Sequence, residues 1–221
     1  MDVSSLIQPP FTVFTDGGAK NNGKKSCVAA WAVYFGEFNL ATYNSSDRIL
    51  IDPSNQKAEL YAIRMALKNL LDYLQTNTVT SIRIVTDSQY SIDCLTKWYK
   101  NWEKNGWRTA KGDHVKHSTV IKESLAMISE IDKRHRIKVI FTHVNSHMIP
   151  PKDTLSDEYA MWYGNFMADK MANEVMSRCA TNGTFQQNLG KVVRVDWDGT
   201  VVATENKADK KAEEGTVVVE W

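Results

Sequence analysis

The chain has 221 residues, of which 43% are hydrophobic and 24% are charged, and its formal net charge at pH 7 is +1. This composition is that of a globular protein with a substantial core, and it excludes a chain whose overall positive charge alone would mark nucleic-acid binding. Any nucleic-acid site must therefore come from local patterning.

The three cysteines and the N-terminal sequence bear on the compartment. Cys27, Cys94 and Cys179 form no C-x-x-C pair, so neither a disulfide framework nor structural zinc is expected. The first residues lack a basic start followed by an apolar run, and no apolar stretch approaches the ~20 residues that span a bilayer. We expect an intracellular monomer, cytoplasmic or nuclear, without membrane association.

The first part of the chain predicts an antiparallel meander. Phe11–Thr15 is a short β-rich run, followed by a turn at Asn22-Gly23. Cys27–Phe35 reads as a second strand and Phe38–Asn44 as a third. Apolar and β-branched runs bounded by turn residues are typical of strands.

Strands then alternate with helices. Ser54 is a predicted N-cap, and apolar residues from Ile63 to Leu74 share one face of the helix that follows. The remaining expected elements are a strand at Ser81–Thr86, a helix from about Ser88 to Tyr99, a helix from Ser118 to about Lys133, a strand at Lys138–Val144 and a helix from about Gly164 to Arg178. This order predicts an α/β fold with a mixed sheet flanked by helices.

The end of the chain differs in character. Lys191–Val195 and Thr200–Thr204 flank a Trp197-Asp198-Gly199 turn, which predicts a β-hairpin. A charged linker and a short strand, TVVVEW, follow it. We expect a main domain over residues 1–180 and a small C-terminal β extension over residues 181–221.

Four carboxylates lie at unusual places. Asp16 and Asp87 each close a β run, and Glu59 lies on the apolar face of its helix. Asp169 lies in the last helix, with Asn165 one turn earlier. Taken singly, these acids also fit turn, cap, boundary or solvated positions. If they converge they must be neutralised, and oxygen ligands of this kind suit Mg²⁺ or Mn²⁺.

Five motifs together resemble the type 1 ribonuclease H family. They are FTDGGAKNNG, NQKAEL, VTDSQY, KWYKNWEKNGWRTAKG and GNFMAD, and they occur in the family's order and spacing. The resemblance covers about residues 11–178. The resemblance implies a ribonuclease H-like five-stranded mixed sheet, with residues 1–180 as the catalytic domain. It implies that two Mg²⁺ ions, or Mn²⁺ in their place, are bound by Asp16, Glu59, Asp87 and Asp169. His147 matches the family's mobile catalytic histidine, whose role is proton transfer or product and metal release.

The same resemblance implies the substrate. It predicts an endoribonuclease that hydrolyses the RNA strand of RNA–DNA hybrids and leaves 5′-phosphate and 3′-hydroxyl ends, with the 2′-hydroxyl distinguishing RNA from DNA. The expected substrate contacts are Gly17, Asn22, Ser54, Asn55, Gln89, Tyr90, Trp98, Lys104 and Asn165. For Asn22 a simple turn role is the alternative.

A basic aromatic segment supplies the local positive charge. Six lysines and arginines lie between Lys97 and Lys116, with Trp98, Trp102 and Trp107 interleaved. Cations neutralise phosphates, and indoles pack on sugars or bases. The alternative is an amphipathic helix with buried tryptophans. We favour burial for Trp102 and Trp107 and substrate contact for Trp98.

Two features depart from the family pattern. Residues 148–164 form a longer loop than the family has, which could cover the site, touch substrate or a partner, or change how His147 moves. Asp52 and His117 stand where the family often has a basic residue and an asparagine that hold a DNA phosphate. This phosphate pocket is therefore weakened or rebuilt, and hybrid specificity is less firmly predicted than catalysis.

Two rival functions remain open at this stage. The first is a non-catalytic nucleic-acid-binding or structural module on the same fold, since fold does not fix function. The second is a DNA-directed nuclease or strand-transfer enzyme of the wider superfamily. The presence of all four acids favours catalysis over the first rival, and the TDSQY motif and the basic tryptophan segment weigh against the second.

Overall fold

A computed structural model of the chain describes residues 9–146, 149–181, 191–195 and 201–206. Five strands form one mixed sheet in the order β3-β2-β1-β4-β5. Neighbouring pairs β1–β2 and β2–β3 are antiparallel, whereas β1–β4 and β4–β5 are parallel. The strands are β1 (Phe11–Lys20), β2 (Val28–Tyr34), β3 (Ser45–Ile49), β4 (Ile82–Thr86) and β5 (Val139–His143). The predicted five-stranded mixed sheet is thus confirmed.

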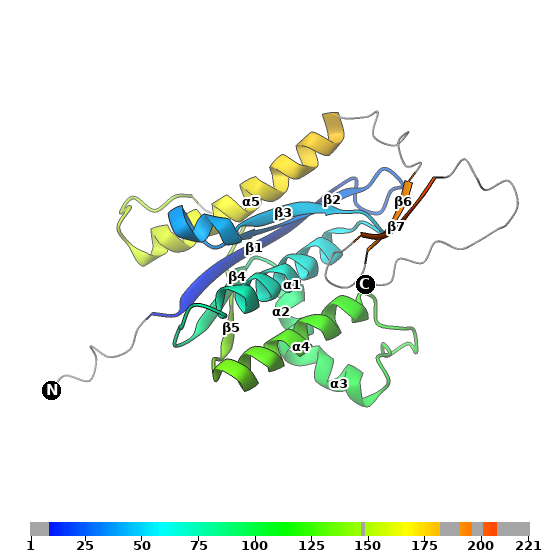
Figure 1. Cartoon of the computed structure of the whole chain (residues 1–221), viewed down its shortest axis with the longest axis horizontal. Helices are drawn as coiled ribbons and strands as arrows, with labels where there is room; N and C mark the ends of the chain where they lie inside the picture. Colours follow the sequence, from blue (N-terminus) through cyan, green and yellow to red (C-terminus); the bar gives the residue numbers. More distant parts are fainter. Residues whose placement is uncertain (1–8, 147–148, 182–190, 196–200, 207–221) are drawn as a thin grey trace, which may run out of the picture. The chain divides into compact units, whose positions relative to one another are not determined.

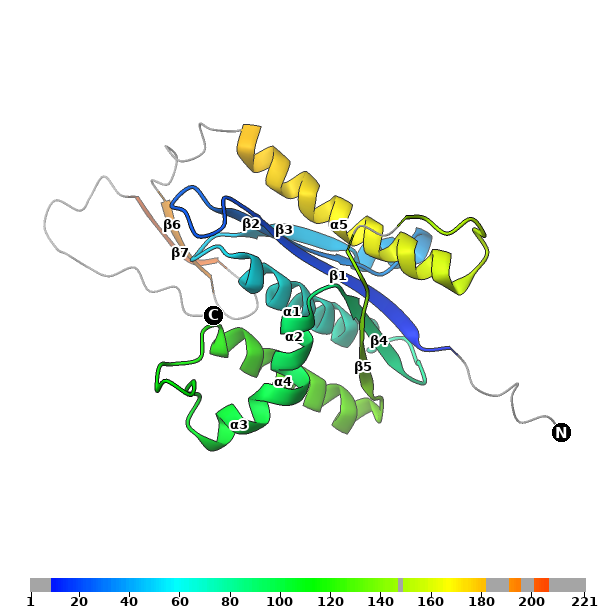
Figure 2. The same cartoon turned by 180° about the vertical axis from the view of Figure 1, so that it is seen from behind.

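Helices cover both faces of this sheet (Figures 1 and 2). α1 (Asn55–Tyr73) and α4 (Ser118–His135) lie on one face, and α5 (Asp157–Thr181) lies on the other. A π-helical turn η3 (Cys94–Trp98) joins α2 (Gln89–Asp93) to α3 (Tyr99–Lys104). The helix expected over Ser88–Tyr99 is therefore real, capped by Ser88, and continues to Lys104. In the described residues, no helix is long and apolar enough to cross a membrane.

Alternation along β1 supplies both halves of the core. Val13 faces the large apolar cluster under α1 and α4, and Phe14 faces the smaller one under α5. The apolar face of α1 is buried as its spacing predicted, from Ala58 to Leu70. Ser54 caps this helix by accepting a hydrogen bond from the backbone N–H of Lys57 at 3.3 Å. The cap fixes where α1 starts, and with it the place of Glu59 in the first turns.

The third strand predicted at Phe38–Asn44 is wrong. Residues Phe38–Tyr43 form a 3-10 helix, η2, without a buried residue, and β3 follows at Ser45–Ile49. Phe38 has a left-handed φ of 53° and a side chain that is 94% exposed. Of the residues in β3 only Ile49 is buried. An edge strand with one buried residue shows almost no apolar alternation in its sequence. The more apolar residues just before it, Phe38–Asn44, were therefore predicted as the strand in its place.

The last helix begins at Asp157 and not at Gly164, so the predicted 148–164 loop is partly helical. The hydroxyl of Ser156 accepts a hydrogen bond from the N–H of Tyr159 at 3.1 Å. Asp157 and Glu158 follow in the first turn, where carboxylates interact favourably with the helix dipole. Both acids fall within residues 148–164, which were expected to form a loop, so the sequence analysis did not recognise them as the start of a helix.

The C-terminal unit is described by its two strands. β6 (Lys191–Val195) pairs antiparallel with β7 (Val201–Asn206), which confirms the predicted hairpin pairing. The chain divides into compact units at residues 1–177 and 178–221. The predicted boundary after residue 180 stays a prediction. The predicted turn Trp197-Asp198-Gly199, the charged linker beyond Asn206 and the strand TVVVEW lie outside the described residues.

Candidate active site

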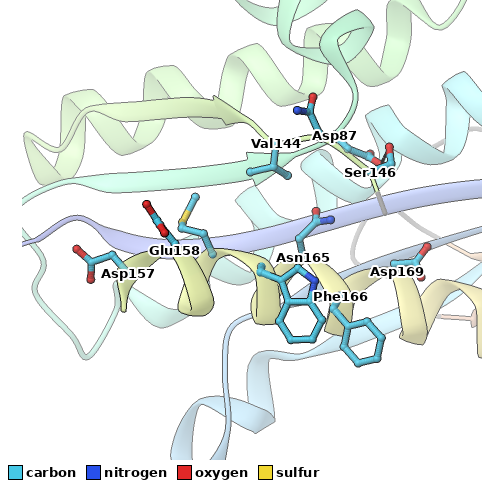
Figure 3. Close-up of a pocket in the computed structure, with 11 residues that line it drawn as sticks. Asp87, Val144, Ser146, Asp157, Glu158, Asn165, Phe166 and Asp169 are labelled. Carbon is cyan, nitrogen blue, oxygen red and sulfur yellow. Dashed lines mark hydrogen bonds between the residues drawn. The ribbon is translucent and has the colours of Figure 1, made fainter. Parts of the chain in front are cut away.

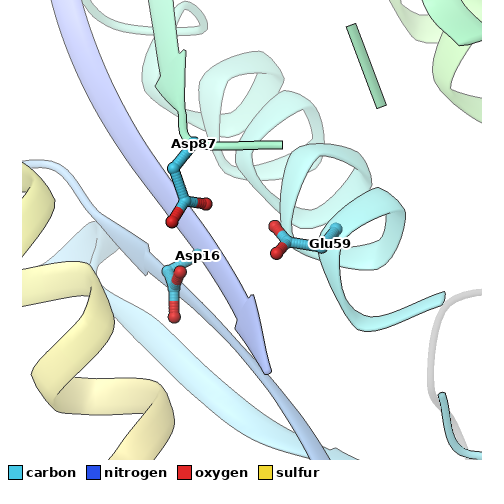
Figure 4. Close-up of side chains that lie close together, drawn as sticks. All are labelled: Asp16, Glu59 and Asp87. Carbon is cyan, nitrogen blue, oxygen red and sulfur yellow. The ribbon is translucent and has the colours of Figure 1, made fainter. Parts of the chain in front are cut away.

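Three of the four predicted metal ligands meet at one point (Figure 4). Asp16, Glu59 and Asp87 each place a carboxylate oxygen so that these atoms lie within 4.8 Å of one another. Asp16 is 8% exposed and Glu59 is 7% exposed. No lysine or arginine in the described part of the chain forms an ion pair with any of the three. The convergence that the sequence left open is therefore a property of the fold.

Asp16 does not close its strand, which corrects the sequence expectation. β1 continues to Lys20, and Asp16 pairs with Ala32 of β2. The parallel pairing of β1 with β4, however, ends at Phe14↔Val85. Asp16 therefore lies just beyond the carboxyl end of β4, where the sheet opens between its two central strands. This is the position at which sites form in sheets with parallel strands.

Glu59 reaches the same opening from α1 because that helix lies almost on the backbone of β1. A Cβ atom at Gly17 would lie 2.2 Å from the backbone nitrogen of Glu59 and 2.3 Å from the carbonyl carbon of Ala58. Only glycine permits this approach. Gly17 was predicted as a backbone contact to RNA, which stays a prediction, and the structure gives it this packing role.

Asp87 follows β4 directly and is held from the neighbouring strand end. The hydroxyl of Ser146 donates a hydrogen bond to Asp87 Oδ2 at 2.7 Å. His143 Nε2 lies 3.0 Å from the backbone carbonyl oxygen of Asp87. The sequence analysis did not single out Ser146. Its signal was weak, since a serine two residues past a strand has many possible roles.

Buried carboxylate oxygens in the cluster lack partners. Among the described residues, Glu59 Oε2 and Asp87 Oδ1 are buried without a hydrogen bond. Burial, followed by the carboxylates of Asp87 and Asp169, raises the pKa of Asp16 to about 7. Burial, followed by Asp16 and Asp87, raises the pKa of Glu59 well above its usual range. Unpaired buried acids that repel each other are stabilised by a cation, so the donor set fits divalent metal ions.

The acid cluster and His117 give the metal-free protein opposing pH dependences. The raised pKa of Asp16 means that the folded chain holds a proton which the unfolded chain loses, so stability falls as pH rises from about 4 to about 7. His117 behaves in the opposite sense, because burial and then Lys116 and Lys57 lower its pKa to about 4. Its neutral folded form makes stability rise with pH between about 4 and 6.5.

In EDTA, the contributions of the acid cluster and of His117 to the pH dependence of Tm should be separable by mutation. The His117→Asn variant should lose Tm more steeply than wild type as pH rises from about 5 to about 7, because only the acid cluster then acts. The Asp16→Asn variant should shift toward a Tm that rises with pH over the same window. Thermal unfolding across pH on the three proteins measures both slopes. Parallel curves for all three would contradict the assignment.

Asp169 lies beside the triad, not within it. It lines a cavity together with Asp87 and Asn165 (Figure 3). The Asp169 carboxylate raises the pKa of Asp16 and accepts a hydrogen bond from Asn173 Nδ2 at 3.0 Å. Asn165 Oδ1 is buried without a partner in the described structure. Asp169 as a metal ligand and Asn165 as a substrate contact stay predictions.

The predicted RNA contacts around α1 form one connected rim. Asn22 Oδ1 accepts a hydrogen bond from the backbone N–H of Asn55 at 3.2 Å, which joins the turn after β1 to the start of α1. Ser54 uses its hydroxyl as the N-cap. Gln89, two residues after Asp87 in the chain, donates from its Nε2 to Asp93 Oδ1 at 2.9 Å. The substrate role of these positions stays a prediction.

A row of aromatic rings follows the basic segment along η3 and α3. Ring centroids lie 5.8 Å apart for Tyr90 and Trp98, 5.9 Å for Trp98 and Trp102, and 6.2 Å for Trp102 and Trp107. Trp102 and Trp107 pack against the core, as expected, whereas Trp98 is 39% exposed. Trp98, which lies between Tyr90 and Trp102 in this row, is thus open to solvent on part of its surface, and its substrate contact stays a prediction. Lys104 ends α3 near this row.

His117, at the predicted phosphate pocket, lies in the field of two lysines and one aspartate. His117 adopts a left-handed φ of 64° before α4, and its Nε2 is buried without a partner among the described residues. Lys57 and Lys116 both lower its pKa, and Asp52 opposes them. Lys57 Nζ also donates to the carbonyl of Ile51 at 2.6 Å. His147, the predicted catalytic histidine, lies outside the described residues.

The carboxylates gather beyond the carboxyl end of β4, which has parallel neighbours on both sides. Oxygen ligands of this kind are typical of the class of proteins that bind divalent cations. The family model for RNase H matches residues 8–177. The chain is 28% identical over 173 residues to ribonuclease H1 of Rattus norvegicus, covering 78% of this chain and 52% of that protein. It is 30% identical over 167 residues to ribonuclease H of Clostridium botulinum, covering 74% of this chain and 93% of that protein.

The chain belongs to the ribonuclease H family. The solved structure of the PFV RNase H domain has the same fold, with a TM-score of 0.54 and 23% identity over 76% of this chain and 94% of that one. The chain spans about half the length of the first mammalian relatives that it matches, at 52% of each. The sequence matches thus establish the family, and the structural likeness establishes the fold.

Proposed function

We propose that the chain hydrolyses the RNA strand of RNA–DNA hybrids and leaves 5′-phosphate and 3′-hydroxyl ends. The observation that carries this proposal is the cluster of Asp16, Glu59 and Asp87, whose carboxylate oxygens lie within 4.8 Å of one another without a cationic partner in the described structure. Membership of the ribonuclease H family supplies the substrate class. The chain would act on its substrate as a monomer.

The three clustered acids and Asp169 would hold two divalent ions, Mg²⁺ or in its place Mn²⁺. When bound, such ions activate a water and stabilise the attacking and leaving oxygens of an in-line phosphoryl displacement. The chain's own residues then have distinct tasks. Glu59 and Asp16 provide buried charge, while Ser146 orients the Asp87 carboxylate. His147 would move a proton or assist release of the product.

The surrounding surface would hold the two strands. Gly17, Asn22 and Asn55 form the rim for the RNA strand, joined by the hydrogen bond between Asn22 and Asn55. Gln89, two residues after Asp87 in the chain, would add a further contact. The exposed ring of Trp98 and the cation of Lys104 would follow the DNA strand, because base or sugar contact with aromatics and phosphate contact with cations are both sequence-tolerant.

Cleavage of three labelled substrates tests the proposal. We expect an end-labelled RNA–DNA hybrid to lose its RNA strand in Mg²⁺ and to survive in EDTA, with duplex DNA and duplex RNA intact. Asp87→Asn should abolish cutting, and Asp132→Asn, the same change on an exposed part of α4, should not. Phosphatase sensitivity of the 5′ ends checks the product. A hybrid that is bound but uncut in both Mg²⁺ and Mn²⁺ would leave a binding module as the function.

A further inference from the structure

A cavity of about 460 Å³ opens beside the acid cluster, between the ends of β4 and β5 and the first turns of α5 (Figure 3). Its volume is in the range of small-ligand sites. The lining residues in the described structure are Asp87, Val144, Asn145, Ser146, Asp157, Glu158, Met161, Trp162, Asn165, Phe166 and Asp169. Asp87 and Asp169 belong to the proposed catalytic site, so whatever enters this cavity lies next to the reacting phosphate.

An aromatic stack forms one wall of the cavity. Trp162 and Phe166, which both line the cavity, stack with their ring centroids 5.3 Å apart and an interplanar angle of 14°. Behind them, the ring of Tyr159 lies 5.4 Å from that of Trp162 and is tilted by 46°. Phe166 is still 43% exposed although Trp162 covers one of its faces. A planar ring entering from solvent would extend this stack by one member. Stacking of this kind is available to any nucleobase, since every base has a π-face.

The charged groups of the cavity and its buried polar atom without a hydrogen-bond partner, Asn165 Oδ1, are acceptors. Asn165 Oδ1 is buried and has no hydrogen-bond partner in the described structure. Asp157 and Glu158 add two carboxylates that are separate from the proposed metal ligands. No lysine or arginine of the described structure lines the cavity. A phosphate would be repelled here, whereas a group with N–H donors would satisfy the unpaired oxygen.

We propose that this cavity binds an unpaired nucleobase that carries an amino group, namely adenine, guanine or cytosine, from the RNA strand held in the active site. The proposal rests on the proposed function, since it is the substrate that brings the base to the cavity. A base inside a duplex is covered on both faces, so the base must come from a bulge or a strand end. Uracil lacks the exocyclic donor and fits the acceptor wall less well.

Binding measurements separate this site from catalysis. The Asp16→Asn protein is expected to hold substrate without cutting it, and Asp16 does not line the cavity. In Mg²⁺, its affinity is measured by fluorescence anisotropy for a fully paired hybrid and for hybrids with one unpaired adenosine at successive positions around the mapped cleavage site. At one position we expect binding about tenfold tighter than to the paired hybrid, from stacking and one satisfied acceptor.

Matched changes on both partners identify the contact. Adding Phe166→Leu should remove the gain, and Phe166→Tyr, which keeps a ring, should retain it. A bulged purine riboside without the amino group and a bulged uridine should gain less than adenosine. Equal affinity for paired and bulged hybrids at every position, or a gain that survives Phe166→Leu, would overturn the proposal. Circular dichroism melts confirm that each variant is folded.

The two proposals fail in different ways. If the unmutated chain cuts paired hybrids while no bulge is preferred, the nucleobase site is refuted and the ribonuclease function stands. If bulged hybrids bind tighter in a Phe166-dependent way but no substrate is cut in either metal, the nucleobase site stands and the catalytic proposal is refuted. The nucleobase site is tested by affinity, so a loss of cleavage activity alone neither supports nor refutes it.

Discussion

An Asp16→Asn variant is expected to lose hybrid cleavage by at least about 1,000-fold, which corresponds to roughly 4 kcal/mol of lost transition-state stabilisation. Asp16 is buried at the centre of the cluster, and its carboxylate oxygen lies within 4.8 Å of those of Glu59 and Asp87. An amide of the same shape keeps the packing and removes the charge that would hold the metal ions. Single-turnover cleavage of the hybrid in Mg²⁺ measures the loss.

The same substitution should stabilise the metal-free protein. At a pH of about 8, which is above the raised pKa of about 7 that burial and the neighbouring acids give Asp16, the ionised side chain is held at a cost. Removing its charge should contribute about 1–3 kcal/mol, or a Tm gain of about 2–4 °C per kcal/mol for a chain of this size. His117 is neutral in both states at this pH and does not interfere.

Metal ions should reverse that order. Mg²⁺ binds only the folded cluster, so it should raise the Tm of the wild type more than that of Asp16→Asn. Thermal melts at fixed pH, in EDTA and across a Mg²⁺ titration, give both quantities on the same samples. Full cleavage by Asp16→Asn, or a variant less stable than wild type in EDTA, would show that the cluster is a structural network and not a metal site.

The acid cluster could be predicted because its members break ordinary sequence rules. Glu59 interrupts an apolar helical stripe, and Asp16 and Asp87 follow apolar β-rich runs. Each signal alone was weak, and the order of the motifs made them specific. The geometry was not predictable in detail. In the sequence, the end of a strand is recognised by the end of apolar alternation, which placed Asp16 at a strand end. In the structure Asp16 lies within β1, because β1 continues by pairing with β2.

Errors in the fold arise where burial is slight or one-sided. The edge strand β3 has one buried residue, so its pattern carried no strand signal. The first turns of α5 were assigned to a loop because Pro150 and Pro151 precede them and acids follow. In the structure those acids begin the helix, and its aromatic residues stack on one another. Because these residues were predicted as a loop, the sequence could not show that their aromatic side chains form a cavity wall.

A Gly17→Ala substitution is expected to destabilise the protein by about 3 kcal/mol, with a Tm loss of about 6–12 °C. The added Cβ would lie 2.2 Å from the nitrogen of Glu59, 2.3 Å from the carbonyl carbon of Ala58 and 2.6 Å from its oxygen. All three are backbone atoms of α1, so no side-chain rotation relieves the contact. Gly17 does not have a positive φ, so the clash, and not the backbone conformation, is the cause.

Gly18→Ala is the matched control one residue away. Its Cβ would meet only the terminal carbon of Met176 at 2.9 Å, the far end of a flexible side chain. We expect a loss below about 1 kcal/mol, because Met adapts its rotamer to small volume changes. Urea unfolding of both variants gives the difference. Equal destabilisation would mean that an added methyl group anywhere on this part of β1 destabilises the protein. The close approach of α1 to Gly17 would then not be the cause of the effect at Gly17.

The clash at Gly17 also links stability to chemistry. To accept a Cβ, the first turn of α1 must move away from β1, and Glu59 moves with it because its own backbone nitrogen is the nearest atom. Gly17→Ala should therefore weaken Mg²⁺ binding beyond what its loss of stability explains, measured by titration at a temperature where the variant is fully folded. Unchanged Mg²⁺ affinity in the folded variant would show that the carboxylate of Glu59 keeps its place without the close contact between helix and strand.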